Sequence, residues 1–299
     1  MTTTPLFLGI DGGGSRCRAR LEASDGRVLG HGVSGPATMR LGFGAARESL
    51  LAATRAALAE AKLAEDALKN VYAGIGLAGT GVPGARETLE AWRHPFAGAW
   101  FEGDGYLALL GAFGGGDGGI VVVGTGSIGI TYQDRTVRVG GYGFPVSDEG
   151  SGADLGLNAL RHALRTLDGR AEASALSKAV LARFAGDAAA ISDWQEKASA
   201  TDYATLAPLV VEHARAGDDA ARRLMRQSAK DISELVAALF AKGAPRVALV
   251  GGLAEHVKAY MPPDAAARLT TPQADAMAGG ILLVKRKLRE RAREAKARP

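Results

Sequence analysis

The sequence predicts an α/β protein made of two domains that share one architecture. The same order of strand, turn, strand, turn and strand occurs at 6–33 and again at 119–139, about 110 residues later. Glycine makes up 41 of 299 residues, about twice its usual share. Of these, 33 lie in residues 1–156, whereas the second half has the apolar spacing of helices. The length also favours two domains over one.

The first half alternates strands and helices. Strands are predicted at 6–11, 16–23, 27–33, 71–77 and 99–102, and helices at 44–62, 85–92 and from 106 to 113. The order restarts with strands at 119–123, 128–133 and 136–139, where Asp134-Arg135 forms the tight turn. Because glycine turns commonly follow strands in unrelated proteins, the alternative to a true repeat stays open.

The second half is predicted to be mostly helical. Helices are expected at 154–167, 173–183, 203–215 and 218–242, followed by a strand at 246–250 and a long helix at 274–298.

Charge and cysteine content exclude several classes of protein. The net charge is +4, but residues 285–299 hold eight Lys/Arg and two Glu, so the rest of the chain is slightly acidic. The basic segment has an apolar stripe and is expected to dock as an amphipathic helix rather than to bind nucleic acid or membrane. A single cysteine, Cys17, excludes a disulfide framework and favours a reducing cytosol. We expect neither a signal peptide nor a membrane span.

Two glycine-rich turns after strands are suited to phosphate. Glycines let the backbone N–H groups approach phosphate oxygens, and a serine hydroxyl adds a donor. The candidates are Gly12, Gly13, Gly14 and Ser15 in the first half, and Gly124, Thr125, Gly126 and Ser127 in the second. Asp11, at the end of the first strand, is the candidate for positioning Mg²⁺, directly or through water. Either turn alone is also compatible with an ordinary hairpin.

Other glycine motifs are weaker. Two segments, 74–79 and 124–129, match G-x-G-x-x-G, but neither opens a helix as dinucleotide binding requires. Gly251 and Gly252 follow a strand and would leave bare backbone for an adenine or ribose, although a tight helix entry explains them equally well.

Three acids lie beside glycines. Asp104 follows a strand and fits the base that accepts a proton from an attacking hydroxyl, although a turn aspartate is an equal alternative. Asp148 and Glu149 follow a glycine-rich loop and are candidates for binding sugar hydroxyls. Asp148 or Ser151 would alternatively cap the following helix.

In this order, these motifs resemble the superfamily of acetate kinase, Hsp70 and the sugar kinases, which has an actin-like (ribonuclease H-like) fold. Within it, the chain resembles the BadF/BadG/BcrA/BcrD-type ATPases, in particular their N-acetylglucosamine and glucosamine kinases. The resemblance covers nearly the whole chain: 11–15 and 124–127 match the two phosphate motifs, 247–252 the adenosine motif, and 73–81 and 274–281 the interdomain connections.

The resemblance implies an active-site cleft between two actin-like domains, at 1–115 and 116–274, with a helix at 275–298 docking on the first. It implies that Asp104 deprotonates a sugar 6-hydroxyl. Thr38, Gly79, Thr125, Asp148 and Glu149 would contact the sugar. Thr38 and Ala78 differ from the Asn and Ser of animal N-acetylglucosamine kinase, which leaves the 2-substituent of the sugar open.

We therefore expect a cytoplasmic, homodimeric amino-sugar kinase that uses ATP and Mg²⁺ and makes the 6-phosphate of N-acetylglucosamine or glucosamine. The alternative is an actin-like regulatory or assembly ATPase with no sugar substrate. The acids Asp104, Asp148 and Glu149 favour the kinase, because an assembly switch does not require them. On this view the glycine excess clears backbone for a nucleotide and a sugar.

Overall fold

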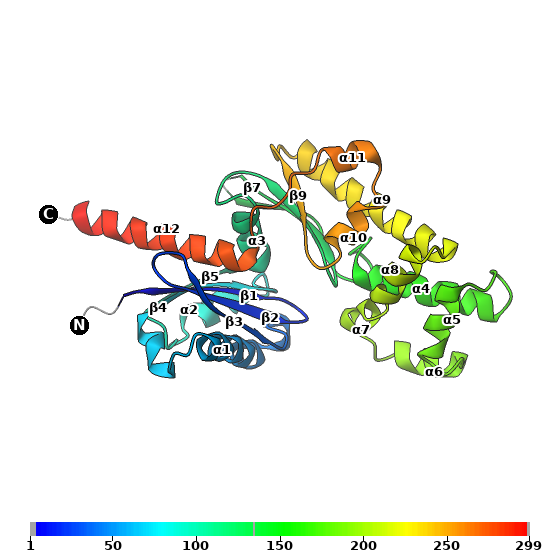
Figure 1. Ribbon diagram of the computed structural model, residues 1–299, viewed down its shortest axis with the longest axis horizontal. Coiled ribbons are helices and arrows are strands. Elements are labelled where there is room, and N and C mark those ends of the chain that lie inside the picture. The colour runs from blue at the N-terminus through cyan, green and yellow to red at the C-terminus, as the bar shows by residue number, and fades with distance from the viewer. Residues whose placement is uncertain (1–3, 134, 298–299) are drawn as a thin grey trace. The chain divides into compact units, whose positions relative to one another are not determined.

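The structure is a computed structural model that describes residues 4–133 and 135–297. The chain divides into two compact units (Figure 1). Unit 1 consists of Met1–Gly116 with Pro272–Pro299, and unit 2 consists of Asp117–Thr271. Each unit has its own sheet and its own hydrophobic core.

Unit 1 is built on a five-stranded sheet with the order β3-β2-β1-β4-β5. Its strands are β1 (Leu6–Gly12), β2 (Cys17–Glu22), β3 (Val28–Ser34), β4 (Val71–Leu77) and β5 (Gly98–Gly103). The first three are antiparallel neighbours, whereas β4 and β5 run parallel to β1. The carboxyl ends of β1, β4 and β5 therefore meet at one edge of the sheet, which is where ligands bind in open α/β sheets.

Helices cover both faces of this sheet (Figure 1). On one face lie α1 (Phe43–Glu60) and α2 (Ala85–Glu90), and on the other α3 (Asp104–Ala112) and α12 (Ala276–Ala297). Two short 3₁₀ helices, η1 (Met39–Leu41) and η2 (Glu65–Asn70), flank α1.

Several glycines of unit 1 let helices approach the sheet closely. A Cβ added at Gly74 of β4 would lie 2.0 Å from the carbonyl oxygen of Gly280 in α12, and one at Gly9 of β1 would lie 1.9 Å from that of Met277. Where α12 crosses α3, a Cβ at Gly279 would lie 1.9 Å from the carbonyl oxygen of Leu107. Helix packing thus adds a second cause to the glycine excess, beside the room for ligands predicted from the sequence.

Unit 2 repeats the same strand order with one strand fewer, β8-β7-β6-β9. The strands are β6 (Gly119–Val123), β7 (Ser127–Gln133), β8 (Arg135–Gly140) and β9 (Val247–Val250), and β9 runs parallel to β6. The repeated order predicted from the sequence is confirmed. The turn predicted at Asp134-Arg135 includes residue 134, which lies outside the described residues.

The helices of unit 2 build a large apolar core on this sheet. They are α4 (Gly152–Leu167), α5 (Ala175–Ala182), α6 (Ala188–Gln195), α7 (Ala200–Ala204), α8 (Ala207–Arg215), α9 (Asp219–Ala241), α10 (Ala254–Lys258) and α11 (Pro263–Ala267). The single helix predicted at 203–215 is wrong, because the chain ends α7 at Ala204 and starts α8 at Ala207, with Pro208 in its first turn. The sequence analysis also missed α6, α10 and α11.

Two further features bear on the predictions. Cys17 is completely buried, and burial raises the pKa of its thiol to about 12, so it packs in the core rather than reacting as a thiolate. Among the residues that the structure describes, no helix combines the length and apolar character needed to cross a bilayer.

Candidate functional site

Unit 1 gathers the predicted residues at the carboxyl edge of its parallel strands. Asp11 on β1 is in register with Gly76 on β4, which in turn is in register with Glu102 on β5. Asp104 begins α3 directly after β5, and its backbone packs over β4, since a Cβ at Gly76 would lie 3.1 Å from the Cα of Asp104. The candidate metal residue and the candidate base therefore lie at neighbouring strand ends.

The turn after β1 is fixed by backbone hydrogen bonds at its base and is exposed at its tip. The N–H of Gly13 donates to the carbonyl of Arg16 at 3.0 Å, and the N–H of Ala37 donates to the carbonyl of Gly13 at 2.9 Å. Gly14 and Ser15 are exposed, and nothing lies within 4 Å of the position of a Cβ on Gly14. A ligand can reach the backbone of this tip. Gly12, by contrast, is buried against Leu77.

Asp11 is held by an arginine that the sequence analysis did not single out. Arg18 lies directly opposite Asp11 in the β1–β2 hairpin. Its Nε donates to Oδ2 of Asp11 at 3.2 Å, and its Nη2 donates to the same oxygen. Both hydrogen bonds end on Oδ2, so Oδ1 is the oxygen that Asp11 would offer to a metal ion.

Asp104 has the environment of a base. The carboxylate is only partly exposed, and Oδ1 accepts a hydrogen bond from the N–H of Gly105 at 2.9 Å. The pKa of Asp104 is raised from 3.8 to about 6. Burial is the main cause and the negative charge of Asp11 adds to it, whereas the hydrogen bond from Gly105 acts in the opposite direction. A carboxylate with a pKa just below neutral is ionised at physiological pH and still accepts a proton readily.

Thr38 and Gly79 lie together at the end of β4, but Thr38 already has structural partners. Its hydroxyl donates to the carbonyl of Ala78 at 3.2 Å and accepts from the N–H of Arg40 at 3.3 Å, as the N-cap of η1. The side chain is 6% exposed. Thr38 therefore shapes this edge of the sheet by joining η1 to β4.

Unit 2 brings three predicted segments together where β6 and β9 end. The carbonyls of Gly124 and Thr125 accept hydrogen bonds from the N–H groups of Gly152 and Ala153, at 2.8 and 3.0 Å. The carbonyl of Val123 accepts a hydrogen bond from the N–H of Leu253 at 3.0 Å. The turn at 124–127, the loop at 148–152 and the pair Gly251-Gly252 thus form one cluster.

Within this cluster the acidic loop rests on the second glycine turn. The hydroxyl of Ser127 donates to the carbonyl of Glu149 at 2.7 Å, and Ser127 is buried. A Cβ at Gly126 would lie 2.6 Å from Oδ2 of Asp148. Gly126 is therefore required for the close approach of the Asp148 carboxylate, while the Ser127 hydroxyl serves the loop rather than a ligand.

Residues of α4 and α9 also hold the loop at 148–152 in place. Ser151 caps α4 by accepting from the N–H of Asp154 at 3.2 Å, which confirms the capping alternative for Ser151. Oδ2 of Asp154 accepts from the N–H of Gly150 at 3.1 Å, and the hydroxyl of Ser228 donates to the carbonyl of Gly150 at 2.6 Å. Tyr142 and Val146, on the same glycine-rich loop, expose 75% and 90% of their surface.

Gly251 has a backbone that an L side chain rarely adopts, with φ at +107°, and a Cβ there would lie 2.4 Å from the carbonyl oxygen of Val123. Tight packing thus explains Gly251. Gly252 is exposed, and nothing lies within 4 Å of its Cβ position, so its backbone is accessible.

The residues at the edge of unit 1 fit a magnesium ion held mainly by phosphate and water. In the described ranges no group of three or more His, Cys, Asp or Glu side chains could hold a metal ion. Mg²⁺ in phosphoryl-transfer sites typically needs only one or two carboxylates together with substrate phosphates. Oδ1 of Asp11 meets that requirement.

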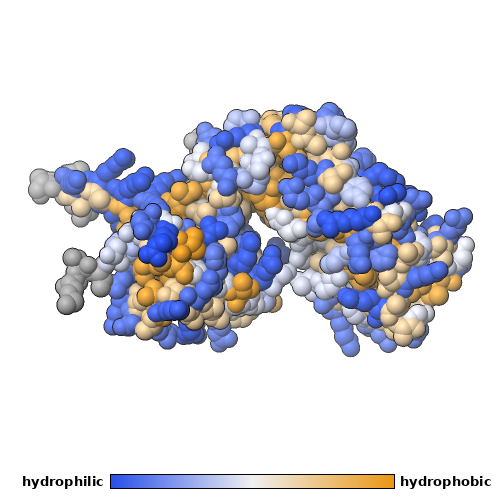
Figure 2. Space-filling view, viewed as in Figure 1, coloured by the Kyte–Doolittle hydropathy of each residue, from blue (hydrophilic) through white to orange (hydrophobic). Residues whose placement is uncertain are grey.

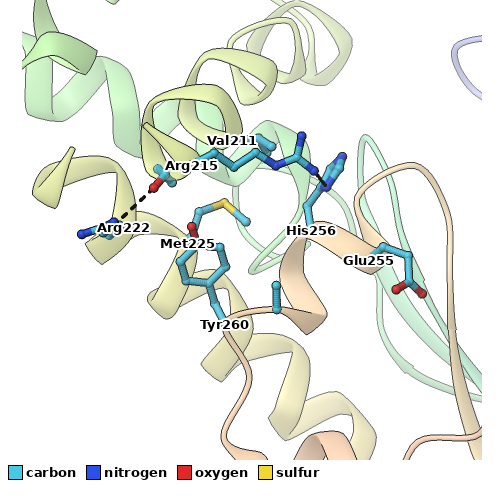
Figure 3. Close-up of a pocket in the computed structure, with 9 residues that line it drawn as sticks. Val211, Arg215, Arg222, Met225, Glu255, His256 and Tyr260 are labelled. Carbon is cyan, nitrogen blue, oxygen red and sulfur yellow. Dashed lines mark hydrogen bonds between the residues drawn. The ribbon is translucent and has the colours of Figure 1, made fainter. Parts of the chain in front are cut away.

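A pocket of about 400 Å³ lies elsewhere in unit 2, between α8, α9 and α10 (Figure 3). A guanidinium nitrogen of Arg215 contacts Nδ1 of His256 at 2.9 Å across it. None of the residues predicted to bind nucleotide or sugar lines this pocket.

Sequence reasoning missed three charged residues around these clusters. The signal for Arg18 was its position opposite Asp11 in the predicted hairpin, and the signal for Asp154 was its spacing of three from Ser151. Arg40 had no such signal, because only the bridge between Thr38 and Ala78 brings it to the site.

The comparisons with known proteins agree with one another. Residues 8–265 match the model of the BadF/BadG/BcrA/BcrD ATPase family. The chain is 36% identical over 283 residues to a protein of Vibrio cholerae named glucosamine kinase GspK, covering 92% of this chain and 94% of that protein. It is 30% identical over 184 residues to the N-acetylmuramic acid/N-acetylglucosamine kinase of Clostridium acetobutylicum, over 58% of each chain. A crystal structure described as a candidate N-acetylglucosamine kinase from Chromobacterium violaceum superposes with a TM-score of 0.86, at 37% identity, covering 94% of this chain and 99% of that one.

Proposed function

Because the chain belongs to the BadF/BadG/BcrA/BcrD ATPase family, we propose that it is an ATP- and Mg²⁺-dependent kinase that phosphorylates the 6-hydroxyl of an amino sugar, N-acetylglucosamine or glucosamine. The observation that carries this proposal is Asp104, a partly buried carboxylate with a raised pKa at the carboxyl edge of the parallel strands of unit 1. The names of the relatives support an amino sugar as the acceptor.

In the proposed reaction the 6-hydroxyl oxygen attacks the γ-phosphorus of ATP. The new O–P bond forms as the bond from the γ-phosphorus to the β,γ-bridging oxygen breaks, and ADP leaves. The carboxylate of Asp104 accepts the hydroxyl proton, and most of the remaining catalysis comes from positioning and charge stabilisation. Water must be kept from the γ-phosphate, because it would compete with the sugar.

Other residues have proposed roles in binding. The backbone N–H groups of Gly14 and Ser15 in the first turn, and of Thr125 and Gly126 in the second, would donate to phosphate oxygens. Those of Gly13 and Gly124 already donate to the carbonyls of Arg16 and Gly126, so these two glycines would shape the turns. Gly252 would face the adenosine. Oδ1 of Asp11 would hold Mg²⁺, which neutralises phosphate charge when bound. Thr125, Asp148 and Glu149 would contact sugar hydroxyls, with Tyr142 and Val146 providing apolar cover.

An assay of ADP release over several sugars tests this function. N-acetylglucosamine, glucosamine, glucose and N-acetylmannosamine are each supplied with ATP and Mg²⁺, next to a reaction without sugar. We expect turnover with one of the two proposed amino sugars, and a product that co-elutes with its 6-phosphate. ADP release that is the same without sugar would instead favour the assembly or regulatory ATPase.

The matched variant for this assay is Asp104→Asn, which keeps the size of the side chain and removes the base. We expect kcat to fall by about 10²–10⁴-fold, while the Kd for ATP changes little. Near-normal turnover in the variant would show that Asp104 is not the base.

A further inference from the structure

Arg40 reaches the edge of unit 1 through a long-range contact. It lies in η1, which is joined to the end of β4 because the N–H of Met39 donates to the carbonyl of Ala78 at 2.9 Å and Thr38 forms a parallel bridge with Ala78. In the sheet, β4 lies between β1, which carries Asp11, and β5, which precedes Asp104. The attachment therefore places Arg40 near the carboxyl end of β4, between these two acids in strand order.

Gly79 fixes the direction of the arginine side chain. Its φ is +77°, and a Cβ there would lie 3.2 Å from Cγ of Arg40 and 3.3 Å from the backbone nitrogen of Arg40. The stem of Arg40 therefore lies across bare backbone at the end of β4. This gives Gly79, which was predicted to contact sugar, a packing role.

The guanidinium is exposed and uncommitted. Arg40 takes part in none of the ion pairs found in the described part of the chain, whereas Arg18 is already bound to Asp11. The charge of Arg40 nevertheless lowers the pKa of the Asp104 carboxyl. Burial and the charge of Asp11 raise that pKa and have the larger effect. The positive charge of Arg40 thus acts on the candidate base without forming an ion pair with it.

We propose that Arg40 binds an oxygen of the phosphoryl group during its transfer to the sugar. This inference rests on the proposed kinase function. A guanidinium presents donors in a planar fork that matches phosphate oxygens, and an arginine beside a transferring phosphoryl group stabilises the charge of the transition state. A sugar hydroxyl is neutral and the amine of glucosamine is cationic, so the phosphoryl group is the better partner.

The test compares Arg40→Met and Arg40→Lys with the unchanged protein from pH 5.5 to pH 9. Arg86→Met is the control, since Arg86 is an exposed arginine of α2 in the same unit. At pH 9, where Asp104 is ionised in every variant, we expect kcat of Arg40→Met to be about 10²–10³-fold lower, with Arg40→Lys between the two. The acid limb of the pH profile should also move above 6, because the pKa of Asp104 rises when the positive charge is removed.

Recovery of full activity in Arg40→Met at pH 9 would overturn the proposal, because Arg40 would then act only on the ionisation of Asp104. Unchanged activity at every pH would overturn it as well. If the unchanged protein phosphorylates no amino sugar, the proposed function fails separately from this inference.

If no amino sugar is phosphorylated, the affinity for nucleotides still tests the role of Arg40, because binding needs no turnover. By calorimetry, Arg40→Met should bind a non-hydrolysable ATP analogue several-fold more weakly and ADP as before, because ADP has no γ-phosphate. An equal effect on both nucleotides, or on neither, would contradict a contact with the transferred group. Thermal melting of each variant shows whether it is folded.

Discussion

The carboxyl of Asp104 is a case in which a single residue is suited to chemistry at the expense of stability. Its pKa is about 6 in the folded protein and 3.8 in an exposed carboxyl, so the ionised form is less favourable in the folded state than in the unfolded chain. Well below pH 3.8 the group is neutral in both states and has no effect. The destabilisation grows as the pH rises through this interval and is fully present above pH 6.

Asp104→Asn should therefore stabilise the protein at pH 8 while it abolishes most activity. The folded and unfolded pKa values correspond to an increase on the order of 1–3 kcal/mol in the free energy of unfolding at pH 8, and to about a third of that increase at pH 4.5. Thermal melting of both proteins at the two pH values measures this. If the variant were less stable than the unchanged protein at pH 8, or if its stability changed equally at both pH values, the ionised Asp104 carboxylate would not destabilise the fold.

Residues differ in how far the sequence reveals them. Asp104 could be proposed as a base because a strand, a glycine and an acid follow one another locally, and local order is what a sequence displays. Arg40 was not found, because its place depends on a bridge between residues 38 and 78. Thr38 was predicted to contact sugar, yet its hydroxyl forms hydrogen bonds with the backbone of Ala78 and Arg40. The partner at Ala78 is 40 residues away in the sequence, so a local motif cannot reveal it.

At the scale of elements, the strands were easier to predict than the helices of unit 2. The apolar runs 71–77 and 119–123 each follow a polar or glycine residue, and β4 and β6 have those bounds. The helical pattern at 203–215 hid an interruption at Thr205 and Leu206, because both α7 and α8 contribute apolar residues to one core. Short helices such as α10 lack enough residues to show a period.

The contact of α12 with the sheet of unit 1 depends on missing side chains. A Cβ at Gly280 would lie 2.6 Å from the carbonyl oxygen of Gly74 and 3.1 Å from the Cα of Gly9, and both are backbone atoms that cannot easily move. Behind this contact, Ile281 and Val284 pack with Phe7. Farther along, the helix from Arg289 to Lys296 is mostly exposed, and Figure 2 shows largely hydrophilic side chains there.

Gly280→Ala should accordingly destabilise the protein although alanine is the better helix former. We expect a loss of about 1–3 kcal/mol in the free energy of unfolding from overpacking, as measured by urea denaturation. Gly44→Ala in α1 is the matched control: nothing lies within 4 Å of its Cβ position, so the same exchange should be neutral or stabilise by about 0.5–1 kcal/mol. Equal effects of the two substitutions would show that α12 does not pack on the sheet in this way.

The whole molecule consists of one continuous and one interrupted unit. Unit 2 runs uninterrupted from Asp117 to Thr271, whereas unit 1 needs Pro272–Pro299 to complete it. The last turn of α3 and the start of the final segment are joined, since the N–H of Gln273 donates to the carbonyl of Ala112 at 2.9 Å and the N–H of Ala274 donates to that of Gly111 at 3.1 Å. Without α12, one face of β1 and β4 would be exposed to water, with Phe7 and Leu107 losing their apolar partners.

This arrangement predicts how fragments of the chain behave. Residues 117–271 alone should fold and unfold cooperatively, because their core cluster lies entirely within the fragment. Residues 1–116 alone should aggregate or lack a cooperative transition, and joining them to 272–299 through a short Gly/Ser linker should restore one, because residues 112 and 273 are already hydrogen-bonded. Circular dichroism on heating separates these outcomes. A cooperative transition in 1–116 alone would mean that α12 covers the sheet without being needed for its fold, and the glycines at 9, 74 and 280 would then need another explanation.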